Sequence, residues 1–307
     1  MKWEESQKIL LTGDFEKGWP SHEEIVSSSP ERGTQSAQTY GKPIWTGDIE
    51  PITLLVNAEF GDGDTIHFWR FIEETKRRVS KVILRCNEDF KTLFSGVEIL
   101  GKEEPLPAFD KIIHMMALPR ALGVKNSELS GEKYLSPNPE YLPQTAIQCL
   151  SLLKFHKIGI CHAGNPFNSR DSIRSIPIEL FEKLKVIEGL KFFTLNKLYE
   201  PPADFIDIRP LMRDWNETAH LVQMMDLVIT VETSIALLAG AMGKKVWMLV
   251  PHIPDWRWGS GDTTVWYDSM KLYRSTGSWE PVLEQISKDL TKHLNEVSVS
   301  SGLVCGL

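Results

Sequence analysis

The sequence predicts an α/β protein with two parallel sheets, one on each side of a proline-rich joint. Short apolar runs alternate with segments of helical periodicity from Ile52 to Val250, a pattern typical of βαβ units and of parallel sheets covered on both faces. The alternation stops at residues 134–144, where three prolines exclude a helix interior or a central strand. A length of 307 residues also favours two domains over one core.

Each element follows from its local pattern. Residues 6–20 suit a short helix closed by a Gly/Pro turn, and residues 27–43 suit an irregular connector. The predicted strands are residues 52–58, 81–86, 110–116, 157–163, 191–196, 226–231 and 244–250. The predicted helices are residues 65–78, 88–94, 144–155, 176–187, 217–225, 234–243 and 279–294. We expect an N-terminal segment at 1–50, a first domain at 51–143 and a second at 144–307, whose last helix is suited to pack on either domain.

Composition excludes several classes of function. Hydrophobic and charged fractions of 42% and 24% are typical of a soluble globular protein, and no segment reaches the roughly 20 apolar residues of a membrane helix. The charged N-terminus has no signal-peptide core, and the four cysteines form no CxxC pair, so we expect a cytoplasmic protein with reduced thiols. A net charge of −7 argues against nucleic-acid binding but allows an anionic small ligand held by local groups.

Three loops follow strands at the edge where α/β sheets bind ligands, namely residues 59–64, 162–175 and 231–234. In the last loop, Thr233 and Ser234 stand where a helix begins. Their hydroxyls, the unpaired N–H groups and the helix dipole suit a diphosphate. An ordinary helix cap would use the same residues.

The loop at residues 162–175 supplies further candidates for this cleft. Asn165 lies within it, and Arg174 precedes a helix start, where a guanidinium pairs with phosphate in a bidentate manner. A solvated surface charge is the alternative for Arg174. His162 ends a predicted strand at the cleft and is a further candidate. The histidines of the chain, including His67, do not have the spacing of metal ligands, so we assign no metal site.

The segment EFGDGD places two carboxylates, Asp62 and Asp64, beside Gly61 and Gly63. The glycines allow a sharp turn and leave space for a ligand. Asp64 is predicted at the N-cap or in the first turn of the next helix, where the helix dipole favours its ionised form unless burial opposes it. Three interpretations stay open: a capping residue, an Asp-Gly-Asp metal pair and a catalytic base.

Two weaker signals come from later loops. Asp255, Trp256 and Trp258 follow the last predicted strand, and the tryptophans suit either a sugar or base site or a contact that pins the loop to the core. Asn216 or Thr218 is expected to cap the helix at 217–225 and to face the ligand.

Taken together and in order, the motifs resemble a known family. They are GDFEKGWP, NAEFGDGDTIHFWRF, LPAFDKIIHMMALPRALG, HAGNP with the RSIP that follows it, DLVITVETSIALLAGAMGKKVWML and PDWRWG. The set is similar to the glycosyltransferase domain that follows tetratricopeptide repeats in many bacterial proteins. That domain is related to the family 9 ADP-heptose heptosyltransferases and distantly to O-linked N-acetylglucosamine transferases. The resemblance extends from Gly13 to about Glu284.

The resemblance implies a GT-B fold, in which two Rossmann-like domains face each other. It also implies inverting transfer of a sugar from a nucleotide-diphosphate sugar to a glycan, lipid-linked or protein hydroxyl, without an essential metal or other cofactor. Asp64 matches the proposed catalytic base, and Arg174 matches the residue that neutralises the diphosphate. The helix-start motif matches Glu232, Thr233 and Ser234. Because GDFEKGWP resembles the junction to the repeats, tetratricopeptide-repeat proteins are expected partners.

The sequence departs from the family pattern at four positions. Glu232 replaces an aspartate, Leu237 a histidine and His162 a tryptophan, while Asp62 replaces an apolar residue. Leu237 cannot donate a hydrogen bond to a phosphate or sugar, so a binding module that has lost turnover is one alternative. A metal-dependent transferase that uses Asp62 and Asp64 is another.

Overall fold

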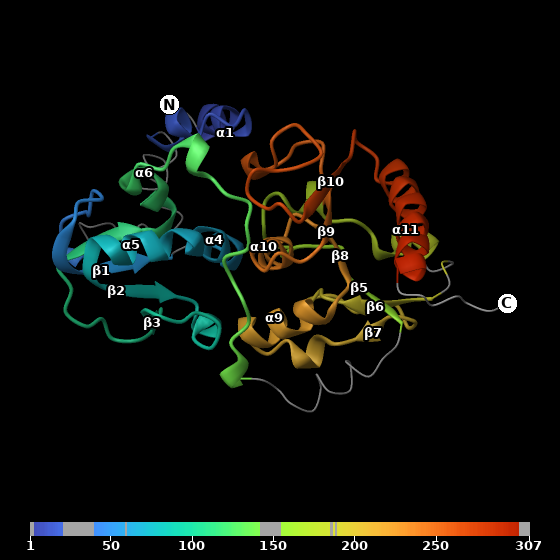
Figure 1. Ribbon diagram of the computed structural model, residues 1–307, viewed down its shortest axis with the longest axis horizontal. Helices are drawn as coiled ribbons and strands as arrows, with labels where there is room; N and C mark the ends of the chain where they lie inside the picture. Colours follow the sequence, from blue (N-terminus) through green and yellow to red (C-terminus); the bar gives the residue numbers. More distant parts are fainter. Residues whose placement is uncertain are drawn as a thin grey trace.

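The computed structural model describes residues 3–20, 40–58, 60–141, 155–184, 187 and 189–300. Within them the chain forms two β-sheets in which all strand pairs are parallel. Figure 1 shows the first sheet on the left and the second on the right, with helices packed around both. The predicted α/β class with two parallel sheets is therefore confirmed.

The first sheet has the strand order β3-β2-β1-β4. Its strands are β1 (Glu50–Asn57), β2 (Val79–Cys86), β3 (Glu98–Gly101) and β4 (Lys111–His114). The helices of this part are α4 (Asp62–Phe68), α5 (Ile72–Arg78) and α6 (Leu118–Leu122). The register places Asn57 at the end of β1 beside Arg85 and His114, so the loop that follows β1 leaves the carboxyl edge of the sheet.

The second sheet has the order β10-β9-β8-β5-β6-β7. Its strands are β5 (His156–Cys161), β6 (Leu190–Thr194), β7 (Ile206–Asp207), β8 (Leu227–Val231), β9 (Val246–Val250) and β10 (Met270–Arg274). The helices are α8 (Asp171–Arg174), α9 (Trp215–Met224), α10 (Ser234–Ala241) and α11 (Glu280–Ser300). Cys161 of β5 pairs with Thr230 of β8, so the loops after these central strands begin side by side.

One continuous cluster of buried apolar side chains joins the two sheets through α4 and α10, which lie next to each other in Figure 1. The N-terminal helix α1 (Trp3–Leu11) and the helical residues 15–20 belong to the same cluster. Phe15 and Trp19 pack against Trp256 from the loop after β9, with ring centroids 6.0 and 5.4 Å away. The N-terminal segment therefore supports a loop of the second half.

The structure also corrects several predicted elements. The helix predicted at 65–78 begins earlier, at Asp62, and is interrupted by a 3₁₀ turn at Trp69–Phe71. The helices predicted at 88–94 and 176–187 are 3₁₀ segments, Glu88–Phe90 and Ile178–Leu184. Strands β3, β7 and β10, which lie at sheet edges, were not predicted. β3 and β7 have only four and two residues, and β10 (MKLYR) carries charged residues among its apolar ones. Nearly all of the helix predicted at 144–155 and most of the connector at 27–43 lie outside the described residues.

Candidate active site

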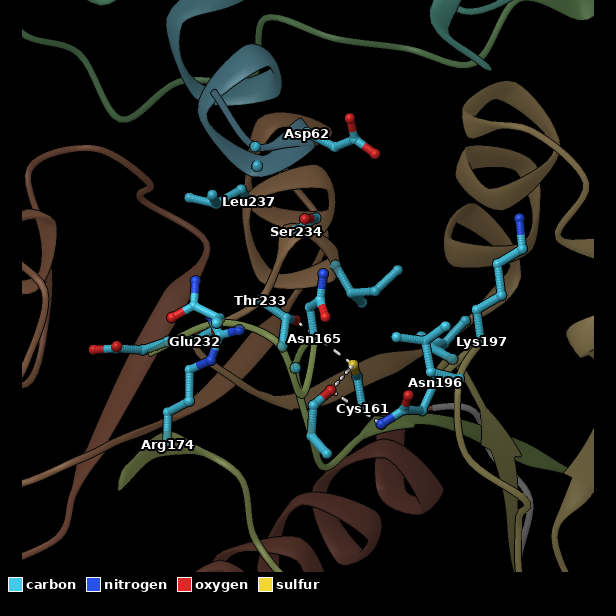
Figure 2. Close-up of a pocket in the computed structure, with 18 of the residues that line it drawn as sticks. Asp62, Cys161, Asn165, Arg174, Asn196, Lys197, Glu232, Thr233, Ser234 and Leu237 are labelled. Atoms are coloured by element: carbon cyan, nitrogen blue, oxygen red, sulfur yellow. Dashed lines mark hydrogen bonds between the residues drawn. The ribbon is translucent and has the colours of Figure 1, made fainter. Parts of the chain in front are cut away.

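A cavity of about 480 Å³ lies between the start of α4 and the carboxyl edge of the second sheet (Figure 2). Its volume is within the range of small-molecule sites. Loops after β1, β5, β6, β8 and β9 contribute to its walls. The predicted site residues that line it are Gly61, Gly63, Asp64, Asn165, Arg174, Thr218, Glu232, Thr233, Ser234, Asp255 and Trp258. All three predicted loops thus contribute to one cavity.

Gly63 allows α4 and α10 to approach closely. A Cβ atom at this position would lie 2.9 Å from Leu237 Cδ1 and 3.3 Å from Ser234 Oγ. A larger residue would therefore require the Leu237 side chain or α4 itself to shift. Leu237 is 7% exposed and packs under α4.

Asp64 is the third residue of α4, and its carboxylate pairs with a buried arginine. Arg257 Nη2 lies 2.5 Å from Asp64 Oδ1. Although 30% of the Asp64 side chain is exposed, the rest is buried in the cavity wall. Burial therefore raises the pKa of Asp64, and the positive charge of Arg257 offsets part of this rise.

Asp62 has a different set of partners. Trp215 Nε1 donates to Asp62 Oδ2 at 3.1 Å, and the Asn87 amide donates to the same carboxylate at 3.3 Å. The Asp62 side chain points away from Thr233 and Ser234 in Figure 2. Over the described residues, no group of three or more His, Cys, Asp or Glu side chains is placed to hold a metal ion.

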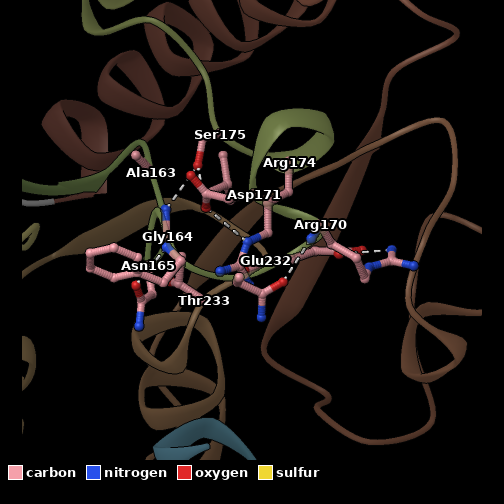
Figure 3. Close-up of polar contacts among 12 residues, drawn as sticks. Ala163, Gly164, Asn165, Arg170, Asp171, Arg174, Ser175, Glu232 and Thr233 are labelled. Atoms are coloured by element: carbon pink, nitrogen blue, oxygen red, sulfur yellow. Dashed lines mark hydrogen bonds and ion pairs between the residues drawn. The ribbon is translucent and has the colours of Figure 1, made fainter.

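Arg174 joins the loops after β5 and β8 (Figure 3). Its Nη1 donates to the Glu232 carbonyl oxygen at 2.9 Å, and its Nε donates to Asp171 Oδ1 at 3.2 Å. The guanidinium lies so close to Gly164 that a Cβ there would be 2.2 Å from Arg174 Nη2. The neighbouring Ser175 hydroxyl accepts from the Gly164 N–H and donates to Asp171. These bonds fix the Arg174 side chain in the cavity wall.

Thr233 is the N-cap residue of α10, but its hydroxyl does not cap the helix. It contacts the Thr230 hydroxyl at 3.1 Å and Cys161 Sγ at 3.6 Å. The side chain thus anchors the helix start to β5 and β8. The first N–H groups of an α-helix have no intrahelical acceptors, and those of α10 begin at Ser234 in the cavity wall.

Glu232 is buried beside the start of α10. Its Oε1 accepts from the Asp255 N–H at 3.0 Å, and its Oε2 lies 3.6 Å from Arg170 Nη2. Burial, together with the charge of Asp255, raises the pKa of Glu232 to about 7, against the opposing effects of the Asp255 N–H, Arg170 and Arg174.

This raised pKa predicts a pH-dependent stability. Since the unfolded glutamate has a pKa of 4.5 and the folded one about 7, the folded state binds more protons between these values. Stability is therefore lost as pH rises from 4.5 through 7, by on the order of 3 kcal/mol. Urea unfolding at several pH values should show that Glu232→Gln flattens this decline relative to wild type. The surface substitution Glu73→Gln is the control, and an unchanged slope in Glu232→Gln would contradict the prediction.

Four of the predicted residues lie outside the cavity. His162 Nδ1 contacts the Ile176 carbonyl, and His67 Nδ1 contacts the Tyr267 hydroxyl. The amide of Asn216 bonds both backbone groups of Asn138 at 2.7 and 3.1 Å, and Trp256 is 3% exposed. These side chains contact the rest of the fold, and the buried position of Trp256 favours its interpretation as a loop anchor. The cap of α9 is Asp214, which accepts from the Glu217 N–H, in place of the expected Asn216 or Thr218.

Sequence reasoning missed other cavity residues, of which Arg257 is the most buried cation. The only feature of the local sequence that could have indicated a role for Arg257 is its position between Trp256 and Trp258. The cavity contains the cationic side chains of Arg170, Arg174, Lys197 and Arg257. The carboxyl side chains of Asp62, Asp64, Asp89, Asp214, Glu232 and Asp255 outnumber them. Binding of an anionic ligand would therefore depend on hydrogen-bond donors that point at the ligand, and not on an excess of positive charge in the cavity.

Comparisons with known proteins found similarities of sequence and of fold. No protein-family model matches the chain. Protein FlbA of Caulobacter vibrioides is 21% identical over 335 residues, an alignment that covers 94% of this chain and 54% of that protein. The chain thus spans about half the length of this curated relative.

Three solved structures share the fold at 12% sequence identity. A glycosyl transferase family 9 protein from Veillonella parvula DSM 2008 aligns with a TM-score of 0.54, covering 80% of this chain and 90% of that one. The E. coli ADP-heptose LPS heptosyltransferase II aligns with a TM-score of 0.53 over 81% and 99%. The iron-containing dodecameric glycosyltransferase TibC from E. coli H10407 aligns with a TM-score of 0.50 over 82% and 78%. In the part of the chain that the structure describes, no helix has the length and apolar character to span a membrane.

Proposed function

We propose that this chain is an inverting, metal-independent glycosyltransferase that moves a sugar from a nucleotide-diphosphate sugar to an acceptor hydroxyl. The observation that carries the proposal is that a single cavity holds Asp64, Arg174 and the start of α10. The fold similarity to a heptosyltransferase and a family 9 glycosyl transferase supports it. In the GT-B arrangement that we propose, residues 51–143 would form the acceptor domain and residues 144–307 the donor domain. The acceptor would be a glycan, a lipid-linked glycan or a protein.

In the proposed reaction, the Asp64 carboxylate takes the proton from the acceptor hydroxyl as that oxygen attacks the anomeric carbon. The bond from the anomeric carbon to the diphosphate oxygen breaks, and the configuration at this carbon inverts. Negative charge then collects on the diphosphate. The N–H groups of α10 and the guanidinium of Arg174 would stabilise that charge.

A nucleotide-sugar-binding module without turnover is the second candidate. It is favoured by Leu237, an apolar side chain where the family has a hydrogen-bonding histidine, and by the ion pair that already occupies Asp64 Oδ1. This candidate predicts that the nucleotide-sugar binds but that the bond between its sugar and its diphosphate is not cleaved. The metal-dependent alternative gains no support from geometry, because Asp62 and Asp64 turn to different partners.

Thermal unfolding with UDP, GDP, ADP, CDP and TDP, each with magnesium or EDTA, tests the proposal. A ligand at 100 times its Kd adds about 2.7 kcal/mol, which raises the midpoint by several degrees. We expect one nucleotide to raise the midpoint by the same amount in magnesium and in EDTA. The sugar conjugate of that nucleotide should then support transfer. A shift that requires magnesium would favour the metal-dependent alternative, and no shift with any nucleotide would contradict donor binding.

Arg174→Ala should weaken binding of the stabilising nucleoside diphosphate by about 10–100-fold, because a hydrogen bond to a charged group contributes about 1.5–3 kcal/mol. Isothermal titration calorimetry measures this loss. Arg209→Ala is the matched control, since the ion pairs of Arg209 with Asp207 and Glu200 lie outside the cavity. Equal affinities for wild type and a folded Arg174→Ala protein would remove Arg174 from the site.

A further inference from the structure

Arg257 connects the two halves of the molecule at the cavity. It belongs to the 3₁₀ turn Trp256–Trp258 after β9, whereas its partner Asp64 belongs to α4 beside the first sheet. Arg257 Nη2 lies 2.5 Å from Asp64 Oδ1, and its Nη1 lies 2.9 Å from Asp255 Oδ1. The guanidinium therefore bridges two carboxylates that line the same cavity.

Packing holds this guanidinium in place. The Arg257 side chain is 7% exposed, and its Cζ lies 4.5 Å from the centre of the Trp256 ring and 5.7 Å from that of Phe68. Its buried Nε has no hydrogen-bond partner among the described residues. Consequently the two carboxylates, rather than solvent, satisfy the charge of Arg257.

The charged groups around Asp64 are few. Burial raises the pKa of Asp64, Arg257 opposes this rise, and Asp255 adds to it. His67 on the same helix has a strongly lowered pKa because of burial, and Tyr267 has a strongly raised pKa for the same reason, so both are neutral near pH 7. Arg257 is thus the cation that directly opposes protonation of Asp64.

We infer that Arg257 is a positioning residue for Asp64, which it holds ionised and oriented toward the acceptor side of the cavity. The inference rests on the proposed function, in which Asp64 removes the acceptor proton. Asp255 takes part by holding Arg257 through Nη1 and by donating its N–H to Glu232. A continuous set of contacts thereby links the start of α10 to the base.

Loss of Arg257 should have a specific effect on the pH dependence of transfer. Without Arg257, the partly buried Asp64 carboxyl keeps its proton to a higher pH, and a protonated carboxyl cannot act as a base. At a pH above the new midpoint the carboxylate forms again and transfer resumes. Loss of Arg257 should therefore move the acid limb of the pH profile and not remove activity at every pH.

The experiment compares wild type, Arg257→Gln, Arg257→Lys and Asp64→Asn. Carbon-13 NMR of aspartate-labelled protein reports the titration of Asp64, whose signal is identified by its loss in Asp64→Asn. Since an adjacent opposite charge lowers a carboxyl pKa by about 1–3 units, we expect Arg257→Gln to shift the midpoint upward by that amount. The acid limb of kcat/KM should shift equally, and Arg257→Lys should restore part of the wild-type midpoint. Arg209→Gln is the matched arginine control and should change neither profile.

The two readouts separate the outcomes. An unchanged Asp64 midpoint in Arg257→Gln would overturn the inference, and so would activity lost to the same extent at every pH. If Arg257→Gln does not fold, Arg257→Lys decides, because its midpoint must then lie above that of wild type. If wild type transfers no sugar from any donor, the proposed function fails, while the NMR titration still determines whether Arg257 controls Asp64.

Discussion

Asp64→Asn is expected to lower kcat for sugar transfer by about 10²–10⁴-fold, the usual contribution of a general base. Asparagine has nearly the same shape as aspartate, and its side-chain oxygen still accepts a hydrogen bond from Arg257. It cannot take the proton of an acceptor hydroxyl. The substitution should therefore remove transfer without disturbing the approach of α4 to α10.

Binding and catalysis should separate in this variant. Asp64 lies on α4 and pairs with Arg257, whereas Arg174 and the first N–H groups of α10 come from loops of the second sheet, so nucleotide affinity should stay nearly unchanged. Calorimetric titration with the nucleoside diphosphate and single-turnover transfer measure the two quantities. A wild-type kcat in Asp64→Asn would show that another group is the base. A large loss of affinity would instead place Asp64 in donor binding.

Trp256→Ala should reduce the free energy of unfolding by about 3–5 kcal/mol, the usual cost of truncating a buried large aromatic side chain. Besides Phe15 and Trp19, the Trp256 ring packs against Trp266 at a centroid distance of 5.7 Å. Removal of this ring leaves a cavity between the N-terminal segment and the loop that carries Arg257. The effect should therefore extend beyond stability.

Urea unfolding with an unchanged m-value measures this loss. Limited proteolysis should also cut the segment around Phe15 faster in Trp256→Ala than in wild type. The control is Phe167→Ala, because Phe167 is 95% exposed and an exposed site should change stability by no more than about 0.5 kcal/mol. If Trp256→Ala were as stable as wild type, the buried contact would not anchor the loop.

The central strands were predictable because their patterns are local. The cores of β1 and β8 are runs of apolar residues that are fully buried, which a short sequence window reveals. Strand β7 has two residues, too few for any periodicity. The break in the helix at Trp69–Phe71 has no proline or glycine to mark it, so only tertiary packing distinguishes it.

The candidate site likewise contains features with a local sequence pattern and contacts that only the fold creates. Glycines before α4 and hydroxyl residues at the start of α10 have local signatures, and the structure brings both segments to one cavity. The pairing of Arg257 with Asp64 joins residues 193 positions apart, and no local pattern records such a contact. The burial of Trp256 likewise depends on a helical segment near the N-terminus. Sequence therefore indicated the segments that carry the chemistry, and the fold supplied their partners.

The close approach of α4 and α10 at Gly63 has a consequence for the rate of the proposed transfer. Because the apolar cluster is continuous across this contact, a hinge motion that separates the halves would expose apolar surface at about 2.5 kcal/mol per 100 Å². Substrate exchange is then expected to proceed through the cavity rim, where Leu198 is exposed. The residence time of the spent nucleotide would follow the motion of the loops at this rim, and it would set the pace of successive transfers.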